Sequence, residues 1–315
     1  MNTIPDGAWP TMLTPYTDTF NVDYDALPSL VEWYRAGGAS GLFAVCQSSE
    51  MFFLSLEERV ALATATVKLR GKGLAVIASG NTADRLDAQI EEIKRIASTG
   101  IDAFVLIANR LAAPDEPEGV WLKSAERILR EVPGIPFGIY ECPYPYKRLM
   151  SPELLGWCAS TGRFLFLKDT SCDAAQIEAK LDALRGTGMK LYNAHSPTLL
   201  ASLRAGGSGY SGVMANFYPG LYAALCSCWK EDPAFAERAQ SLVGTVALLE
   251  RQAYPVNAKA FLAAEGLPIR RSCRSRDAHD FTPAQELELA QARAVFGPIV
   301  ASLESEALAR NGGRR

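Results

Sequence analysis

The chain has 315 residues, 48% hydrophobic and 21% charged, a composition typical of a large globular protein with an ample core. Its formal net charge is only -3 and it has no run of basic residues, so neither nucleic acid nor an anionic membrane is an expected partner. No segment approaches the roughly 18 apolar residues of a membrane span. Residues 1–7 lack the basic, then hydrophobic, pattern of a secretion signal, so we expect a cytoplasmic protein.

Short apolar segments alternate with longer amphipathic ones over most of the chain, and this alternation predicts the fold. Eight strands are predicted, at residues 8–13, 41–45, 74–78, 103–107, 137–140, 163–168, 190–193 and 209–213. Helical stretches lie between them, such as residues 25–35, 56–69, 83–98, 120–131 and 173–184. Eight strands, each followed by a helix, predict an α/β protein with a (β/α)8 TIM barrel over residues 1–225.

The strand pattern stops after about residue 225. Residues 233–249, 255–264 and 282–308 have helical patterns, so we expect a C-terminal helical region over residues 226–315.

Metal and disulfide chemistry have little support in the sequence. The 7 cysteines are scattered, odd in number and without CxxC spacing, so they predict neither a disulfide framework nor a zinc site. His195 and His279 are the only histidines and lie far apart, so the usual imidazole ligands are nearly absent. We therefore expect no protein-bound catalytic metal.

Lys168 stands at the end of the apolar run 164–167, where a buried strand finishes. A primary amine at the mouth of an apolar barrel is partly desolvated, which lowers its pKa and leaves a neutral nucleophile that can attack a carbonyl. This placement indicates Schiff-base chemistry. The alternative is that Lys168 is the first solvated residue after the strand and pairs with Asp169.

Catalytic groups of a TIM barrel lie at the C-terminal ends of its strands, so the residues after each predicted strand are candidates for the site. Lys168 and Tyr140 follow adjacent strands. The other segments at strand ends are 14–15, 46–50, 79–81, 109–110, 141–143, His195 and 211–212.

The ordered set of these motifs resembles the dihydrodipicolinate synthase and N-acetylneuraminate lyase family over nearly the whole chain. The motifs are Thr-Pro at 14–15, Ser-Ser-Glu at 48–50, Tyr-x-x-Pro at 140–143, Lys-Asp at 168–169 and Gly-Gly-x-Gly at 206–209. The resemblance implies that Lys168 forms an imine with a 2-oxo acid, usually pyruvate, without a metal or an organic cofactor. It also implies a homo-oligomer, either a tetramer or a dimer.

The resemblance assigns roles to further residues. Tyr140 would relay protons, because a phenol both donates and accepts hydrogen bonds. Ser48 and the backbone N–H groups around Gln47 would hold the carboxylate of the 2-oxo acid. Ser211 falls where the family offers a backbone carbonyl to the reacting centre. For Ser48 the alternative is a helix cap, and for Tyr140 it is an aromatic residue at the barrel mouth.

The chain departs from the synthases in the proton relay. After the fourth strand they carry Pro-Tyr-Tyr, whose second tyrosine crosses into the neighbouring subunit, whereas this chain has Asn109-Arg110-Leu111. Gln47 also replaces the hydroxyl residue that links the tyrosine of the fifth strand to that relay. Protons must therefore travel by another route.

Two departures concern the substrate. Pro145 stands where the synthases carry an arginine that grips the aldehyde's carboxylate, so aspartate semialdehyde is not the expected substrate. Glu141 stands where asparagine is usual; it could bind sugar hydroxyls or assist loss of water, or it could pair with Lys147 or Arg148 on a surface loop. Arg110 could serve as a carboxylate clamp or be an exposed loop arginine.

The sequence thus predicts a Schiff-base lyase, either an aldolase or a dehydratase, that acts on pyruvate, a 2-oxo (3-deoxy) sugar acid or a related hydroxy-oxo acid. Two alternatives stay open. The glycine-rich segment 206–212 could cradle a phosphate, which would make the protein a phosphosugar enzyme. The altered relay could instead mark a retired barrel that binds a 2-oxo acid as a sensor.

Overall fold

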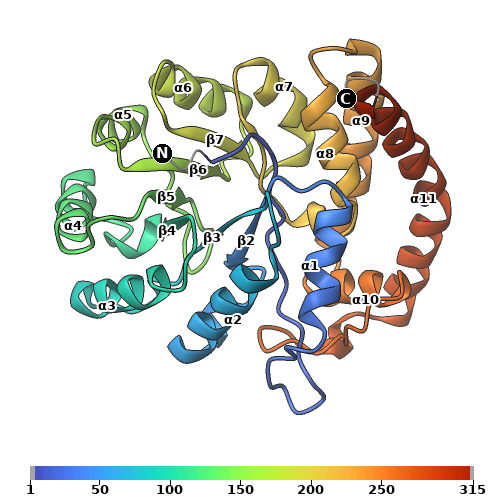
Figure 1. Cartoon of the computed structure of the whole chain (residues 1–315), viewed down its shortest axis with the longest axis horizontal. Helices are drawn as coiled ribbons and strands as arrows, with labels where there is room; N and C mark the ends of the chain where they lie inside the picture. Colours follow the sequence, from blue (N-terminus) through green and yellow to red (C-terminus); the bar gives the residue numbers. More distant parts are fainter. Residues whose placement is uncertain (1–3, 313–315) are drawn as a thin grey trace.

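The structure is a computed structural model and describes residues 4–312. Within this range, eight parallel strands form a nearly closed barrel surrounded by helices, as the sequence predicts (Figure 1). The strands are β1 Gly7–Ala8, β2 Gly41–Val45, β3 Ala75–Ala78, β4 Ala103–Ile107, β5 Phe137–Tyr140, β6 Phe164–Asp169, β7 Lys190–Asn193 and β8 Gly209–Tyr210.

The two ends of the barrel sheet are less regular than predicted. β1 was expected over residues 8–13, but Pro10 has no N–H to donate to a strand ladder. The segment after β1 instead closes the barrel irregularly: Phe43 donates its N–H to the carbonyl of Pro10, and Met12 donates to the carbonyl of Phe43. β8 likewise ends at Tyr210 rather than at residue 213, because the chain turns at Gly212 into the 3-10 helix η4, Val213–Asn216.

The helices that cover the barrel follow the predicted stretches closely. They are α1 Leu27–Ala36, α2 Leu56–Leu69, α3 Leu86–Ala97, α4 Glu118–Glu131, α5 Pro152–Ser160, α6 Ala174–Leu184, α7 Leu199–Arg204 and α8 Pro219–Cys228. Ser55 forms a capping box with Glu58 at the start of α2, and Ser151 and Asp173 cap α5 and α6. These caps satisfy N–H groups that the first turn of a helix leaves without partners.

The C-terminal region is helical, as expected. Helices α9 Pro233–Val246, α10 Val256–Ala264 and α11 Pro283–Gly312 lie on one side of the barrel, and α11 packs against α8 (Figure 1). α9 is shorter than predicted because the 3-10 helix η5, Ala247–Arg251, replaces its last turn. The predicted division after residue 225 falls inside α8, and whether two separate domains exist stays a prediction. No described helix is long and apolar enough to cross a bilayer.

Aromatic side chains fill the centre of the barrel below the strand ends. Phe166 stacks on Tyr192 with ring centroids 4.3 Å apart, and Trp9 packs edge-on against both rings. All three are fully buried. Side chains alternate along a strand, so Lys168 points to the same side of β6 as Phe166 and lies one layer nearer the barrel mouth.

Gly209 shows why the segment 206–209 is rich in glycine. A Cβ at this residue would lie 1.9 Å from the carbonyl oxygen of Gly7, so only glycine allows β1 and β8 to come this close. The segment leads into β8, which begins at Gly209, and therefore lies at the N-terminal end of the barrel, opposite the end where Lys168 lies.

Candidate active site

A cavity of about 660 Å³ opens at the C-terminal ends of the barrel strands. Lys168 of β6 and Tyr140 of β5 line it together with Gln47 and Ser48 from the loop after β2. The structure thus brings four of the predicted site residues into one cavity. The other lining residues are Glu50, Phe52, Phe53, Pro143, Tyr144, Thr170, Ala194, Gly212, Val213, Glu250, Arg251, Tyr254, Pro255, Ser275 and Arg276.

Lys168 is a buried amine without a counter-ion among the described residues. The β5–β6 register places it opposite Tyr140, and its Nζ lies 4.4 Å from the centroid of the Tyr140 ring. Only 4% of its surface is exposed, so burial lowers the pKa of the amine to about 8. Asp169 pairs with Lys180 instead, so the alternative of a solvated Lys168–Asp169 pair is wrong.

Tyr140 lies beside the amine as a neutral phenol. Its hydroxyl donates a hydrogen bond to Oε1 of Gln47, 3.3 Å away. Burial raises the pKa of Tyr140 well above 10, so the phenol keeps its proton at neutral pH. The thiol of Cys142 donates to the same oxygen of Gln47. Gln47 therefore holds the Tyr140 hydroxyl in place.

Ser48 belongs to a loop that is fixed from both sides. Its hydroxyl donates to Oγ1 of Thr11, 3.1 Å away, and the side chain is nearly buried. Glu50, two residues on, has a left-handed backbone with φ 62°. The Glu50 carboxylate pairs with Lys259 of α10 at 3.0 Å, and both side chains are buried. The loop therefore links the barrel to the C-terminal region.

Ser211 lies at the cavity edge rather than on its wall. Its N–H donates to the carbonyl of Asn193, and Gly212 and Val213, which follow it, line the cavity. The Ser211 hydroxyl is buried and has no hydrogen-bond partner among the described residues.

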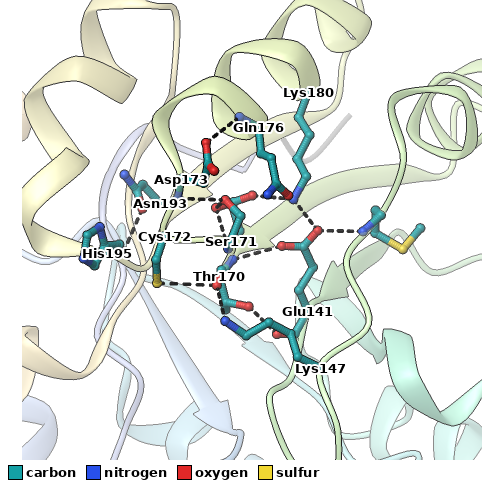
Figure 2. Close-up of polar contacts among 12 residues, drawn as sticks. Glu141, Lys147, Thr170, Ser171, Cys172, Asp173, Gln176, Lys180, Asn193 and His195 are labelled. Atoms are coloured by element: carbon teal, nitrogen blue, oxygen red, sulfur yellow. Dashed lines mark hydrogen bonds and ion pairs between the residues drawn. The ribbon is translucent and has the colours of Figure 1, made fainter. Parts of the chain in front are cut away.

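Glu141 does not line the cavity, and its carboxylate lies in a buried ion network (Figure 2). Lys180 of α6 contacts both Glu141 and Asp169, at 2.5 Å and 2.6 Å. The Glu141 carboxylate also accepts the N–H groups of Met150 and Thr170. Burial raises the pKa of Glu141, and the Lys180 ammonium acts in the opposite direction. This carboxylate therefore joins β5, β6 and α6, and it is not placed to bind substrate.

The expected surface pairing of Glu141 with Lys147 or Arg148 is also wrong. Lys147 donates to the carbonyl of Thr170, and Arg148 donates to the carbonyls of Ala113 and Glu116.

Arg110 does not reach the cavity either. Its guanidinium donates to the carbonyl of Thr82 and pairs with Asp84 at 2.6 Å. The side chain of its neighbour Asn109 donates to the carbonyls of Cys142 and Tyr144. The 3-10 helix η2, Ala108–Arg110, thus supports the loop after β5 and contributes no side chain to the cavity wall.

Several cavity residues come from places that the sequence did not indicate. Glu250 and Arg251 end η5, and Tyr254 follows them, so part of the wall belongs to the C-terminal region. Tyr254 accepts a hydrogen bond from Nδ2 of Asn216. His195 does not line the cavity; its Nδ1 lies 3.1 Å from Oγ1 of Thr198, and partial burial lowers its pKa. No cluster of side chains able to hold a metal ion occurs among the described residues.

The fold and the cavity define a TIM-barrel protein with a buried lysine at the C-terminal ends of its strands, which forms no ion pair with the residues described. The sequence model of the Dihydrodipicolinate synthetase family matches residues 5–292, and the chain belongs to this family. The family consists of class I aldolases and lyases.

Individual relatives are distant but similar over most of their length. The chain is 25% identical to a 4-hydroxy-tetrahydrodipicolinate synthase of Shewanella piezotolerans, covering 84% of this chain and 86% of the relative. It is 27% identical to an N-acetylneuraminate lyase of Rhizobium meliloti, covering 95% and 97%. The structure of YagE, a family member from E. coli K12 in complex with pyruvate, superposes with a TM-score of 0.85 at 19% identity, covering 93% and 98%. This last likeness shows the fold.

Proposed function

We propose that the protein is a Schiff-base-forming lyase in which Lys168 binds a 2-oxo acid as an imine. The observation that carries the proposal is the state of the Lys168 amine, which is buried, without a counter-ion among the described residues, and has a pKa of about 8. A usable fraction of such an amine is neutral near neutral pH, as attack on a carbonyl requires. The relationship to lyases and the pyruvate bound in YagE support the choice of ligand.

The reaction follows from the imine. Nζ of Lys168 attacks C2 of the 2-oxo acid, and the carbinolamine loses water to give a protonated imine. In an aldol cleavage the C4 hydroxyl loses its proton, the C3–C4 bond breaks, and its electron pair moves through C2 onto the imine nitrogen to give an enamine. In a dehydration the C3 proton is removed and hydroxide leaves C4. Tyr140, beside the nitrogen, relays a proton to and from the carbinolamine hydroxyl and accepts the proton that the C4 hydroxyl loses in the cleavage.

The loop after β2 supplies the other end of the site. Ser48 and the backbone N–H groups around Gln47 hold the carboxylate of the 2-oxo acid, since a small hydroxyl and amides bind an anion without crowding the imine. Ser211 contributes its main chain at the cavity edge. Glu141 and Arg110 have no part in substrate binding in this proposal, because both are engaged outside the cavity.

The substrate class is a 2-oxo (3-deoxy) sugar acid or a related hydroxy-oxo acid, with pyruvate as the product or the donor. The arginine that would grip a second carboxylate from the β5 loop is replaced by Pro145. The reaction needs no metal or organic cofactor, because the lysine imine is itself the electron sink. We further propose a cytoplasmic homo-oligomer, which light scattering of the full chain tests.

A panel of 2-oxo acids tests this function. Each compound is incubated with the protein and product formation is followed. A parallel sample is reduced with borohydride, and its mass is measured by mass spectrometry of the intact protein. We expect an adduct with pyruvate and turnover of at least one hydroxy-oxo acid. An adduct without turnover would favour the sensor alternative. The phosphosugar alternative is less well supported, since residues 206–209 lie at the opposite end of the barrel and, of the segment 206–212, Gly212 alone lines the cavity.

A further inference from the structure

Glu250 is a carboxylate of the cavity wall that the mechanism above leaves without a role. It lies in η5, the short 3-10 helix between α9 and α10, and it is half-buried. The position is well defined: Leu249 beside it is buried, and its carbonyl accepts hydrogen bonds from Nδ2 of Asn257 at 2.6 Å and from the N–H of Gln252 at 3.1 Å. These contacts tie η5 to α10, and η5 also packs against η4, the segment after β8, with Glu250 on the cavity wall.

The two carboxylates of the cavity wall differ in what binds them. Glu50 is fully engaged, since it pairs with Lys259 and accepts the N–H groups of Arg274 and Ser275. The Glu250 side chain makes no hydrogen bond or ion pair with any residue in the described range 4–312. The positive charges of Arg251 and Lys168 lower the pKa of its carboxyl, and the charge of Glu250 in turn raises the pKa of Lys168. Glu250 is therefore a free carboxylate that faces the cavity of the amine.

An imine enzyme of this kind needs a base at C3. Removing a C3 proton from the imine gives the enamine, and the enamine that cleavage of the C3–C4 bond leaves must take up a proton at C3. Tyr140 and Tyr254 are poor candidates for the base that removes the C3 proton. Burial raises the pKa of both phenols well above 10, so each already carries its own proton. Burial likewise keeps the Cys46 and Cys142 thiols protonated by raising their pKa. His195 lies outside the cavity wall.

Glu250 meets the requirement. Burial, the largest effect, raises the pKa of its carboxyl, and Arg251 and Lys168 partly oppose this. A raised pKa makes a carboxylate a stronger base.

We propose that Glu250 is the catalytic base that removes a proton from C3 of the Lys168 imine and returns it to the enamine. This rests on the proposed function. In the forward step the C3–H pair becomes the C2=C3 double bond, the C2=N pair moves to nitrogen, and the proton bonds to a carboxylate oxygen of Glu250. In the reverse step the Glu250 carboxylic acid gives this proton back to C3. The C-terminal region thus supplies the acid–base group, since the loop after β4 contributes no side chain to the cavity wall.

Deuterium exchange into pyruvate tests the proposal without knowledge of the natural substrate. The full chain is incubated with pyruvate in D2O, and deuteration of the methyl group is followed by NMR. Borohydride trapping measures the imine in the same samples. For Glu250→Gln we expect trapping like the wild type and exchange slower by about 10²–10⁴-fold, the usual contribution of a positioned base. Glu178→Gln, on the exposed face of α6, is the matched control and should exchange like the wild type.

Two further variants separate chemistry from folding. Glu250→Asp keeps the charge and moves the carboxylate back by one methylene, so we expect intermediate exchange. Glu250→Ala should recover exchange when formate is added, because a small carboxylate can enter the space of the lost side chain, whereas a structural loss would not respond. Exchange at the wild-type rate in Glu250→Gln, or slow exchange that formate does not restore in Glu250→Ala, would overturn the proposal. If the wild type traps no pyruvate, the proposed function itself fails.

Discussion

Replacing Lys180 by methionine should destabilise the fold strongly. Lys180 is 2% exposed, and its ammonium pairs with both Glu141 and Asp169, whose side chains are 0% exposed. Methionine has a similar length and retains the packing of α6 on β6, but it leaves two carboxylates in the interior without a counter-ion. Removing one partner of a buried ion network costs about 3–5 kcal/mol. A typical domain has a free energy of unfolding of about 5–15 kcal/mol, so this loss is a large share of it.

Equilibrium unfolding in urea measures the effect, provided that the transition is reversible. The free energy of unfolding of Lys180→Met should fall by about 3–5 kcal/mol. The variant Glu141→Gln keeps a one-to-one Lys180–Asp169 pair and should lose much less. In the double variant Lys180→Met/Glu141→Gln one buried charge is removed, so we expect a favourable interaction energy of about 0.5–3 kcal/mol relative to additivity. A loss below about 1 kcal/mol for Lys180→Met, the range of an exposed ion pair, would refute the reasoning.

Three further predictions concern the cavity. The rate of adduct formation with pyruvate should rise as the pH rises toward about 8 and level off above it, because the buried Lys168 ammonium loses its proton with a pKa of about 8; a rate that keeps rising beyond pH 10 would contradict the lowered pKa. Tyr140→Phe should slow adduct formation by about 10²–10⁴-fold when samples are trapped with borohydride at successive times. A rate equal to that of the wild type would show that Tyr140 does not relay protons. Ser48→Ala should raise the KM for the 2-oxo acid, whereas Arg110→Ala should leave it unchanged; the reverse pattern in steady-state kinetics would show that the carboxylate is bound at the β4 loop.

The barrel could be predicted from the sequence because its strands and helices have different hydrophobic periods. The errors at the two ends of the sheet have local causes. An apolar segment that contains Pro10 still resembles a strand in composition, although it cannot form a regular ladder. Gly212 ends β8 early because the chain turns there into η4.

The sequence predicted correctly those site residues whose position depends only on where a strand ends. It missed those whose position depends on the direction of the side chain or on packing between distant segments. Lys168 and Tyr140 were found because parallel strands bring their C-terminal ends together. Glu141 follows an inward-facing residue, so strand alternation turns it outward, and its partner Lys180 lies on a helix whose packing no local pattern reveals. Glu250 reaches the cavity only through the docking of the C-terminal region on the barrel, which the sequence periodicity does not indicate.

The most direct test of the central claim is to locate the adduct on the chain. The protein is treated with pyruvate and borohydride, digested, and the modified peptide is sequenced by mass spectrometry, with Lys168→Ala treated in parallel. We predict a single reduced pyruvate adduct on Lys168 in the wild type and none in the variant. A modification on another lysine, or an equal adduct in Lys168→Ala, would contradict the assignment of Lys168 as the nucleophile.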